Sequence, residues 1–350
     1  MHFYIYFSFT LILSFFCTAG VCIGMQRLRI VDSPRSKKRK IHKKKIPLGG
    51  GIAIFVSFFL VAAVLTITGT LGETVSPRML WLLFFAGFVL MIGGALDDRY
   101  TLRPLQQIWF PLVAAVIIAF SGIGPVEVTN PFGGTISLAQ SISLFTVANV
   151  LVFFWLFGMM FTTKFLDGLD GLVTGIVAIG ALMIFFLSRQ TQWYQPEVAV
   201  LAIVFAGACF GFLVWNWHPA KIFLGEGGSL FTGFMLGVLA IISGGKIMTT
   251  LLVIGIPMLD LVRVVIHRLQ HKRPIYKGDS EHLHFKLIES GLSQKQAVLF
   301  LYAISFLFGM TTLFLQSKEK LIALSFLFIL MLLLAVWFQY GDKHRFNKRI

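Results

Sequence analysis

The sequence predicts an all-α polytopic membrane protein with about eleven transmembrane helices, its amino terminus outside and its carboxyl terminus in the cytoplasm. Three observations support this fold class. Hydrophobic residues occupy 57% of the 350 positions and the mean hydropathy is +0.84, a composition typical of polytopic membrane proteins. Eleven apolar runs are long enough to cross about 30 Å of hydrocarbon. The basic residues are also divided very unevenly between the two sides that these runs would create.

The apolar runs give the expected helices in order. They cover 3–24, 48–70, 79–96, 105–122, 143–161, 171–188, 197–215, 228–243, 247–263, 294–316 and 320–339. Only His2 precedes the first run, and a basic cluster follows it at 35–45. A signal peptide carries its positive charge before the apolar core, so the first run is interpreted as a retained helix.

The charge distribution gives the orientation. Of the 30 Lys and Arg residues, 25 fall in alternate segments between the runs, and five fall in the others. The positive-inside rule places the first set in the cytoplasm, which predicts a multi-pass protein of the inner (cytoplasmic) membrane. Because the net charge of +15 follows the membrane topology, it does not indicate a nucleic-acid partner.

Two segments interrupt the helical pattern, and no internal repeat divides the chain, so 1–350 is read as a single membrane domain. Segment 122–142 alternates small apolar and polar residues around Asn-Pro and Gly-Gly, which predicts a short outer hairpin. Segment 264–293 is expected to be a cytoplasmic loop, and loops of this length are usually functional.

Carboxylates are few, yet several lie where predicted helices meet the cytoplasm. They are Asp97, Asp98, Asp167, Asp170, Glu226 and Asp260. One interpretation is that they are interfacial charges that pair with nearby Lys and Arg. Their gathering from different helix ends on one face favours a divalent-cation site. Because the segment around Asp167 and Asp170 lacks the spaced oxygen ligands of an EF-hand, Mg²⁺ is the better candidate.

Groups suited to phosphate accompany the carboxylates. The glycine-rich turn 225–229, before a helix expected to begin near Ser229, could form an amide nest. Arg263, His282 and His284 lie in or beside the long polar loop. A zinc site would need further ligands at suitable spacing, so phosphate or pyrophosphate binding is preferred. The sequence therefore predicts metal-assisted chemistry on a phosphate ester at the cytoplasmic surface.

Six motifs, taken in order, resemble the polyprenyl-phosphate N-acetylhexosamine-1-phosphate transferases, a glycosyltransferase family 4 group that includes undecaprenyl-phosphate N-acetylglucosamine-1-phosphate transferases. They are VDSP with its basic run, His42 and PLGGGIAIF (31–55), LDDRYTLRP (96–104), FLDGLDGL (165–172), FLGEGGSLFTG (223–233), PMLDLVRV (257–264) and EHLHFKL (281–287). The resemblance covers most of the chain, and the family's fold of roughly eleven helices agrees with the expected topology.

The resemblance implies that a polyprenyl (undecaprenyl) phosphate attacks a UDP-sugar, giving a lipid-linked sugar and UMP. This step would initiate a cell-envelope polysaccharide, of the cell wall or of lipopolysaccharide O-antigen, with N-acetylglucosamine as the expected sugar. The implied cofactor is Mg²⁺, with Mn²⁺ as the alternative; membrane lipid is a further partner, and a homodimer is left open. The implied site residues are Asp97, Asp98, Asp167 and Asp170 (catalytic), Asp167 and Glu226 (metal), and His42, Lys164, Arg263, His282 and His284 (substrate).

The chain also departs from the family's usual pattern. Lys164 stands where asparagine is common, Glu226 where aspartate is common and Phe285 where a further histidine is common, while Gln106 and Gln107 lie near a usual basic position. A cation at Lys164 could compete with magnesium or hold a phosphate. The departures are compatible with retained activity, with a different sugar or with lost activity.

Three alternatives stay open. The chain could be a non-catalytic homologue that binds polyprenyl phosphate, and such a protein should tolerate Asp167→Asn. It could use another UDP-N-acetylhexosamine or UDP-N-acetylmuramoyl-pentapeptide, although the latter branch has a longer histidine run. A cation transporter would place its carboxylates near the bilayer midplane, whereas these cluster at one interface.

Overall fold

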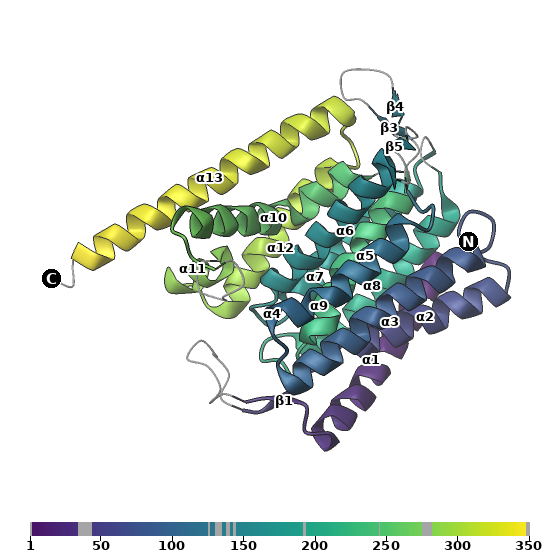
Figure 1. The fold of residues 1–350 in the computed structure, drawn as a ribbon, viewed down its shortest axis with the longest axis horizontal. Helices are drawn as coiled ribbons and strands as arrows, with labels where there is room; N and C mark the ends of the chain where they lie inside the picture. Colours follow the sequence, from purple (N-terminus) through teal and green to yellow (C-terminus); the bar gives the residue numbers. More distant parts are fainter. Residues whose placement is uncertain are drawn as a thin grey trace.

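The computed structural model is a bundle of helices with a few short strands (Figure 1). It describes residues 2–33, 44–124, 127–129, 135–137, 141–142, 145–191, 194–244, 246–274 and 282–347. The helices are α1 (Phe3–Arg27), α2 (Gly51–Ile67), α3 (Pro77–Tyr100), α4 (Pro104–Gln107), α5 (Trp109–Ala119), α6 (Val147–Leu166), α7 (Leu172–Ser188), α8 (Pro196–Asn216), α9 (Gly225–Ile242), α10 (Ile247–Gln270), α11 (Leu283–Glu289), α12 (Gln294–Thr311) and α13 (Ser317–Asn347).

Each predicted apolar run contains a helix, with α4 and α5 sharing one run. Six of the described helices, α1, α3, α6, α8, α9 and α10, are long and apolar enough to span a membrane, and shorter apolar helices cover 51–67, 104–119 and 172–188. The structure therefore supports a polytopic membrane protein. The number of eleven spans and the orientation of the termini stay predictions.

The short strands form three antiparallel pairs. Strands β1 (Val31–Asp32) and β2 (Ile46–Pro47) flank the basic segment, and β5 (Ser141–Ile142) pairs with β6 (Phe145–Thr146) just before α6. The predicted hairpin in 122–142 is present, since β3 (Glu127–Thr129) pairs with β4 (Thr135–Ser137).

The predicted loop 264–293 is partly helical, which corrects its boundaries. Helix α10 continues to Gln270, and α11 begins at Leu283. The polar residues after Arg263 resemble a loop by composition. A helix that leaves the apolar layer can nevertheless continue with polar side chains, because its backbone hydrogen bonds are made within the helix.

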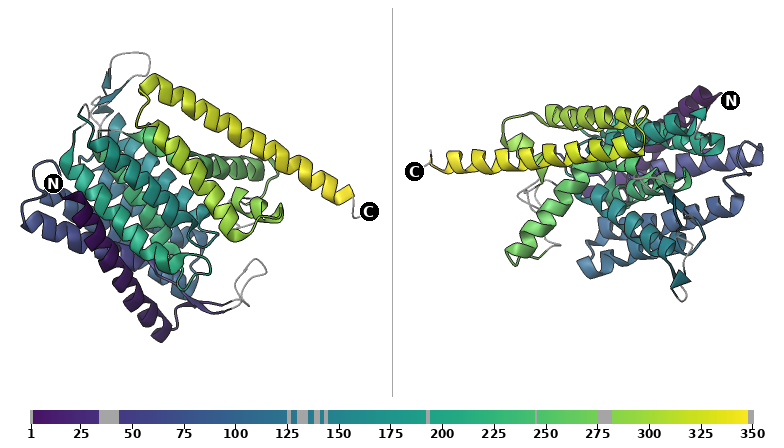
Figure 2. Two further views of the ribbon diagram at one scale, coloured as in Figure 1. Left: turned by 180° about the vertical axis from the view of Figure 1, so that it is seen from behind. Right: turned by 90° about the horizontal axis from the view of Figure 1, so that it is seen from above.

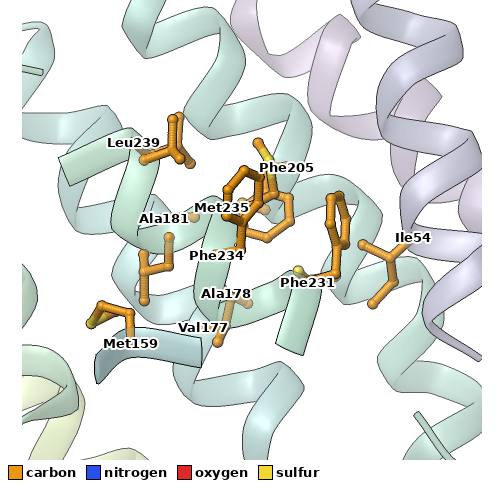
Figure 3. Packing of buried hydrophobic residues seen from close by; sticks show 14 of the residues in the cluster. Ile54, Met159, Val177, Ala178, Ala181, Phe205, Phe231, Phe234, Met235 and Leu239 are labelled. Atoms are coloured by element: carbon orange, nitrogen blue, oxygen red, sulfur yellow. The ribbon is translucent and has the colours of Figure 1, made fainter. Parts of the chain in front are cut away.

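Helix α9 lies at the centre of the bundle and contacts α2, α3, α6, α7, α8 and α10. Figure 3 shows Phe231, Phe234 and Leu239 of α9 packed among buried side chains of the neighbouring helices, including Phe205 of α8 and Met159 of α6. Lipid tails are as apolar as these side chains, so close van der Waals packing holds such helices together.

Glycines of α9 allow the closest approaches. A Cβ atom on Gly227 would lie 3.3 Å from the Cα of Gly94 in α3, and one on Gly228 would lie 2.7 Å from the Cα of Gly51 in α2. Larger residues at these positions would force the helices apart. The backbones of α2, α3 and α9 therefore meet at the end of α9 that carries Glu226.

Helices α10, α12 and α13 form the other side of the bundle, where α13 packs against α10 and α12 (Figure 2). The carboxyl-terminal part of α13 extends beyond the rest of the bundle (Figures 1 and 2). Asp260 lies on α10 and accepts a hydrogen bond from the backbone N–H of Leu283, the first residue of α11.

Candidate active site

The carboxyl ends of α3 and α6 and the first turn of α9 bring acidic side chains together. Oδ1 of Asp98 accepts a hydrogen bond from the backbone N–H of Glu226 at 3.2 Å. The charges of Asp98, Asp170 and Glu226 all act on Asp167. The predicted convergence of carboxylates from several helix ends is therefore present.

Asp167 ends helix α6 as its C-cap residue. Its carboxylate has no hydrogen-bond or ion-pair partner among the residues that the structure describes. Desolvation of this group, followed by the negative charges of Glu226, Asp98 and Asp170, raises its pKa to about 8. Because the residue as a whole is exposed, repulsion among the carboxylates is the cause that the geometry supports more directly.

Asp97 is held by the turn that follows α3. It accepts hydrogen bonds from the backbone N–H of Leu102 at 2.7 Å and from Nε2 of Gln107 at 2.8 Å. The amide oxygen of Gln107 in turn accepts from Nζ of Lys164 at 2.9 Å, and Lys164 forms an ion pair with Glu226. The side chains of Asp97, Gln107, Lys164 and Glu226 thus form one continuous polar chain.

This polar chain links three of the departures from the usual family pattern. Lys164, Glu226 and Gln107 contact one another in sequence. The longer carboxylate of Glu226 forms an ion pair with Lys164, so the positive charge that Lys164 introduces is neutralised by a carboxylate. Lys164 was predicted to bind substrate, but in this structure its ammonium group is directed to Glu226 and Gln107.

The glycine-rich turn is already part of helix α9, which begins at Gly225 and not near Ser229. Gly225 has a φ of +79°, and a Cβ atom there would lie 2.5 Å from Oδ2 of Asp98. The N–H of Glu226, one of the amides expected to form a phosphate nest, is bonded to Asp98. The start of α9 therefore positions carboxylates, which corrects the nest interpretation at this amide.

Asp170 is positioned by the segment between α8 and α9. Its Oδ2 atom lies 2.7 Å from Nδ1 of His218 and accepts from the N–H of Ala220 at 3.1 Å. Asn216 supports the same turn: its Oδ1 accepts from the N–H of Gly171 at 3.0 Å and its Nδ2 donates to the carbonyl of Ile222 at 2.9 Å.

Sequence reasoning missed His218. The available signal was the polar stretch NWHPAK at 216–221, which interrupts two apolar runs on the same predicted side as the acidic motifs. Its histidine lies far from the HLH motif in sequence, and no spacing rule connects it to Asp170. The structure places it in direct contact with that carboxylate.

The histidine motif is anchored to α10 through a buried carboxylate. Asp260 accepts from the N–H of Leu283 at 3.0 Å and from Nη2 of Arg263 at 2.8 Å, and Nδ1 of His282 lies 2.9 Å from its Oδ2. These contacts are made where water is largely excluded, so they fix the start of α11 strongly. Arg263, predicted to bind substrate, is turned toward Asp260.

His284 lies against the turn that follows Asp167. A Cβ atom on Gly168 would come 2.3 Å from Nε2 of His284 and 2.9 Å from Cζ of Phe285. The rings of His282 and His284 are stacked, with centroids 5.6 Å apart. Burial, followed by the charge of His282, lowers the pKa of His284 to about 3, so its ring is neutral. Its Nε2 atom has no hydrogen-bond partner among the described residues.

The structure therefore joins two groups of predicted residues that are distant in sequence. Asp97, Asp98, Asp167, Asp170, Lys164 and Glu226 form the acidic cluster, and His282 and His284 lie beside it through Gly168. His42 lies outside the described residues. Among the described residues, no three His, Cys, Asp or Glu side chains stand together as a complete set of metal ligands.

Comparison with known proteins gives concordant matches. Residues 80–244 match glycosyl transferase family 4. The chain is 32% identical over 316 residues to a probable undecaprenyl-phosphate N-acetylglucosaminyl 1-phosphate transferase of Bacillus subtilis, covering 89% of this chain and 84% of that protein. It is also 32% identical over 323 residues to a decaprenyl-phosphate N-acetylglucosaminephosphotransferase of Mycobacterium tuberculosis, covering 83% of this chain and 77% of that protein.

A second kind of relative is similar over a comparable length. A phospho-N-acetylmuramoyl-pentapeptide-transferase of Halalkalibacterium halodurans is 31% identical over 329 residues, covering 88% of this chain and 96% of that protein. The family match over residues 80–244 contains the acidic cluster and the segment that carries His218.

Proposed function

The chain belongs to glycosyl transferase family 4, and on this premise we propose that it transfers N-acetylglucosamine 1-phosphate from UDP-N-acetylglucosamine to a polyprenyl phosphate and releases UMP. The observation that carries the proposal is that the acidic cluster lies next to the His282–His284 pair, with His284 packed against Gly168, the residue after Asp167. In the proposed topology this site faces the cytoplasm, and the reaction starts a cell-envelope polysaccharide.

The choice of donor rests on the histidine motif. The relatives include both N-acetylglucosaminyl 1-phosphate and phospho-N-acetylmuramoyl-pentapeptide transferases. In this chain the motif is HLHF, and Phe285 packs toward Gly168. We favour the smaller donor because the motif lacks the longer histidine run associated with the pentapeptide branch.

The residues fit a divalent cation. Asp167 has no partner within the described ranges and lies beside other carboxylates, whose mutual repulsion a cation would relieve. Mg²⁺ is usually held by one or two carboxylates together with substrate phosphates and water, and such a site needs no larger set of protein ligands. Asp167 would hold Mg²⁺, with Glu226 as the second carboxylate and Mn²⁺ as the alternative ion. When bound, the ion would neutralise charge on the donor diphosphate.

In the proposed reaction, an oxygen of the carrier phosphate forms a bond to the β-phosphorus of the donor. The bond between that phosphorus and the bridging oxygen breaks, and UMP leaves with the bridging oxygen. A phosphate monoester has a second pKa of about 6, so the nucleophile is largely ionised at neutral pH. Asp97 and Asp98 would therefore act mainly by positioning the reacting groups.

The remaining residues would bind the diphosphate. His282, held by Asp260, and the neutral ring of His284 would contact the donor phosphates. Lys164 would keep Glu226 charge-balanced while the diphosphate is absent. Asp170, held by His218, would support the donor side of the site.

The reaction can be tested through its nucleotide product. Purified protein should release UMP from UDP-N-acetylglucosamine only when undecaprenyl phosphate is present, and more slowly from UDP-N-acetylmuramoyl-pentapeptide. Release of UDP, or release that does not need the carrier, would contradict the proposed transfer. A preference for the pentapeptide donor would retain the reaction and overturn the donor choice.

We expect Gly168→Ala to reduce transfer by about 100-fold, since displacement of reacting groups by about 1 Å can have that effect. The added methyl group would collide with His284 and Phe285 and move the histidine motif away from Asp167. Gly158→Ala on α6 is the matched control, because a Cβ atom there meets nothing within 4 Å. Equal activity of the two variants would show that this contact is not needed.

We expect His218→Ala to lower transfer by about 10- to 100-fold, as for other residues that orient a functional carboxylate. The change removes the 2.7 Å contact that fixes Asp170. The measurement is the rate of UMP release at saturating donor. His2→Ala, at the start of α1, should leave the rate unchanged, and an equally active His218→Ala protein would exclude a positioning role.

A further inference from the structure

An apolar groove lies between α10 and α13. The end of the groove that is nearer the start of both helices points to the membrane face opposite the acidic cluster. It has a volume of about 470 Å³ and is lined by Leu251, Gly255 and Met258 of α10 and by Leu324 and Phe328 of α13, among others. This volume lies in the range of roughly 300–1,000 Å³ that is usual for small-molecule pockets.

The packing of α13 on α10 explains the groove. A Cβ atom on Gly255 would come 2.9 Å from Cδ2 of Leu327, so the glycine lets the helices approach at this level. The hydroxyl group of Ser325, the polar side chain of the lining, donates to the carbonyl of Leu321 at 3.0 Å. With that group satisfied inside its own helix, the groove presents an apolar surface.

Two lysines precede the lining residues of this groove, one on each helix. Lys246 immediately precedes α10, and Lys320 lies in the first turn of α13. Positions 320, 324 and 328 follow one another at four-residue intervals, so Lys320 shares a helix face with the lining residues Leu324 and Phe328. The two lysines therefore lie beyond one end of the apolar lining, toward the start of both helices.

The charge of Lys320 acts on Lys246, and neither lysine is neutralised by a carboxylate among the described residues. Lys246 donates to the hydroxyl group of Ser188 at 3.2 Å, and neither lysine forms an ion pair with a carboxylate in the described ranges. Both residues are partly buried. Burial, followed by the charge of Lys320, lowers the pKa of Lys246 to about 8. Two positive charges that repel each other are stabilised by an anion bound between them.

We propose that Lys246 and Lys320 bind the phosphate of an anionic phospholipid whose acyl chain occupies the groove between α10 and α13. Charge complementarity selects the headgroup, and the apolar lining accommodates the chain. The site lies on the membrane face opposite the acidic cluster, so its occupant is distinct from a carrier lipid whose phosphate must reach Asp167. In the proposed topology it belongs to the outer leaflet.

The proposal can be tested by native mass spectrometry of the full chain purified in detergent. Phosphatidylglycerol and phosphatidylcholine with identical acyl chains are added in turn, and the retained lipid is measured. We expect tighter retention of phosphatidylglycerol, and a loss of about 10- to 30-fold in the Lys246→Gln, Lys320→Gln double variant, since each lysine near an anionic lipid contributes modestly. Lys318→Gln, an exposed neighbour on α13, is the control.

A second variant tests the groove itself. Ser325→Trp should fill it and weaken retention of phosphatidylglycerol while both lysines remain, with the elution volume and melting temperature used to verify folding. Glycerol phosphate, which lacks acyl chains, should not compete. Equal retention of the two lipids, unchanged binding by either variant, competition by glycerol phosphate, or occlusion of the groove by a second copy would each overturn the proposal.

Discussion

Asp167→Asn is expected to abolish detectable transfer, a loss of about 100- to 1,000-fold or more, comparable with removal of a group that stabilises charge in a transition state. The substitution keeps the shape of the side chain and removes its charge. Asp167 has no partner among the described residues and is repelled by its neighbours. The variant should therefore be at least as stable as the parent protein while it loses activity.

Comparison of two variants separates this effect from general damage. Asp97→Asn should also abolish transfer, because Asp97 links Leu102 and Gln107 within the site. Glu73→Gln, on an exposed residue between α2 and α3, should be fully active. The measurements are lipid-product formation and melting temperature of membrane-inserted protein. Normal turnover of a well-folded Asp167→Asn protein would refute the site and favour a non-catalytic lipid-binding homologue.

A double-mutant cycle on Lys164 and Glu226 is expected to show strong coupling. Lys164→Asn removes the cation that is paired with Glu226, so the charge of Glu226 then adds to the repulsion around Asp167. Glu226→Asp shortens the side chain and moves its carboxylate away from Lys164. Each single change should lower activity, whereas the double change installs the pair of residues common in the family and should recover much of it. Contacting residues typically couple by about 0.5–3 kcal/mol.

The control for this cycle is a second ion pair in the same protein. Lys286 and Glu289 lie 3.0 Å apart on α11 and are more exposed, so Lys286→Asn and Glu289→Asp should combine almost additively. Activity and melting temperature are measured for both cycles. Additive effects at Lys164 and Glu226 would show that the two residues do not act as a pair.

The helices were predictable to the extent that they are apolar. Every long apolar run contains a helix. The helix boundaries differ from the predicted ones where polar or glycine-rich residues are also helical. Residues 264–270 extend α10 although they are polar, and Gly225–Gly228 belong to α9 although glycine-rich segments usually indicate turns. The close packing of Gly227 and Gly228 on α3 and α2 is a tertiary effect that local sequence does not encode.

The gathering of carboxylates was predictable from the sequence, but the network of contacts among them was not. The predicted membrane sidedness and the motif order placed Asp98, Asp167 and Glu226 on one face, and the structure brings these three residues together. The pairing of Lys164 with Glu226 was not foreseen, because the two substitutions stand 62 positions apart and each was considered alone. His218 was missed for the same reason, since its partner Asp170 lies 48 positions away.

The most direct test of the central claim is transfer of radiolabel from UDP-N-acetylglucosamine, labelled in its β-phosphate, to an organic-extractable lipid. Purified protein is incubated with undecaprenyl phosphate, with Mg²⁺ or with a chelator. The acidic cluster predicts labelled lipid that requires both the carrier and Mg²⁺. Absence of labelled lipid with every UDP-sugar, from folded protein that still binds the carrier, would contradict the assignment of the cluster as a transferase centre.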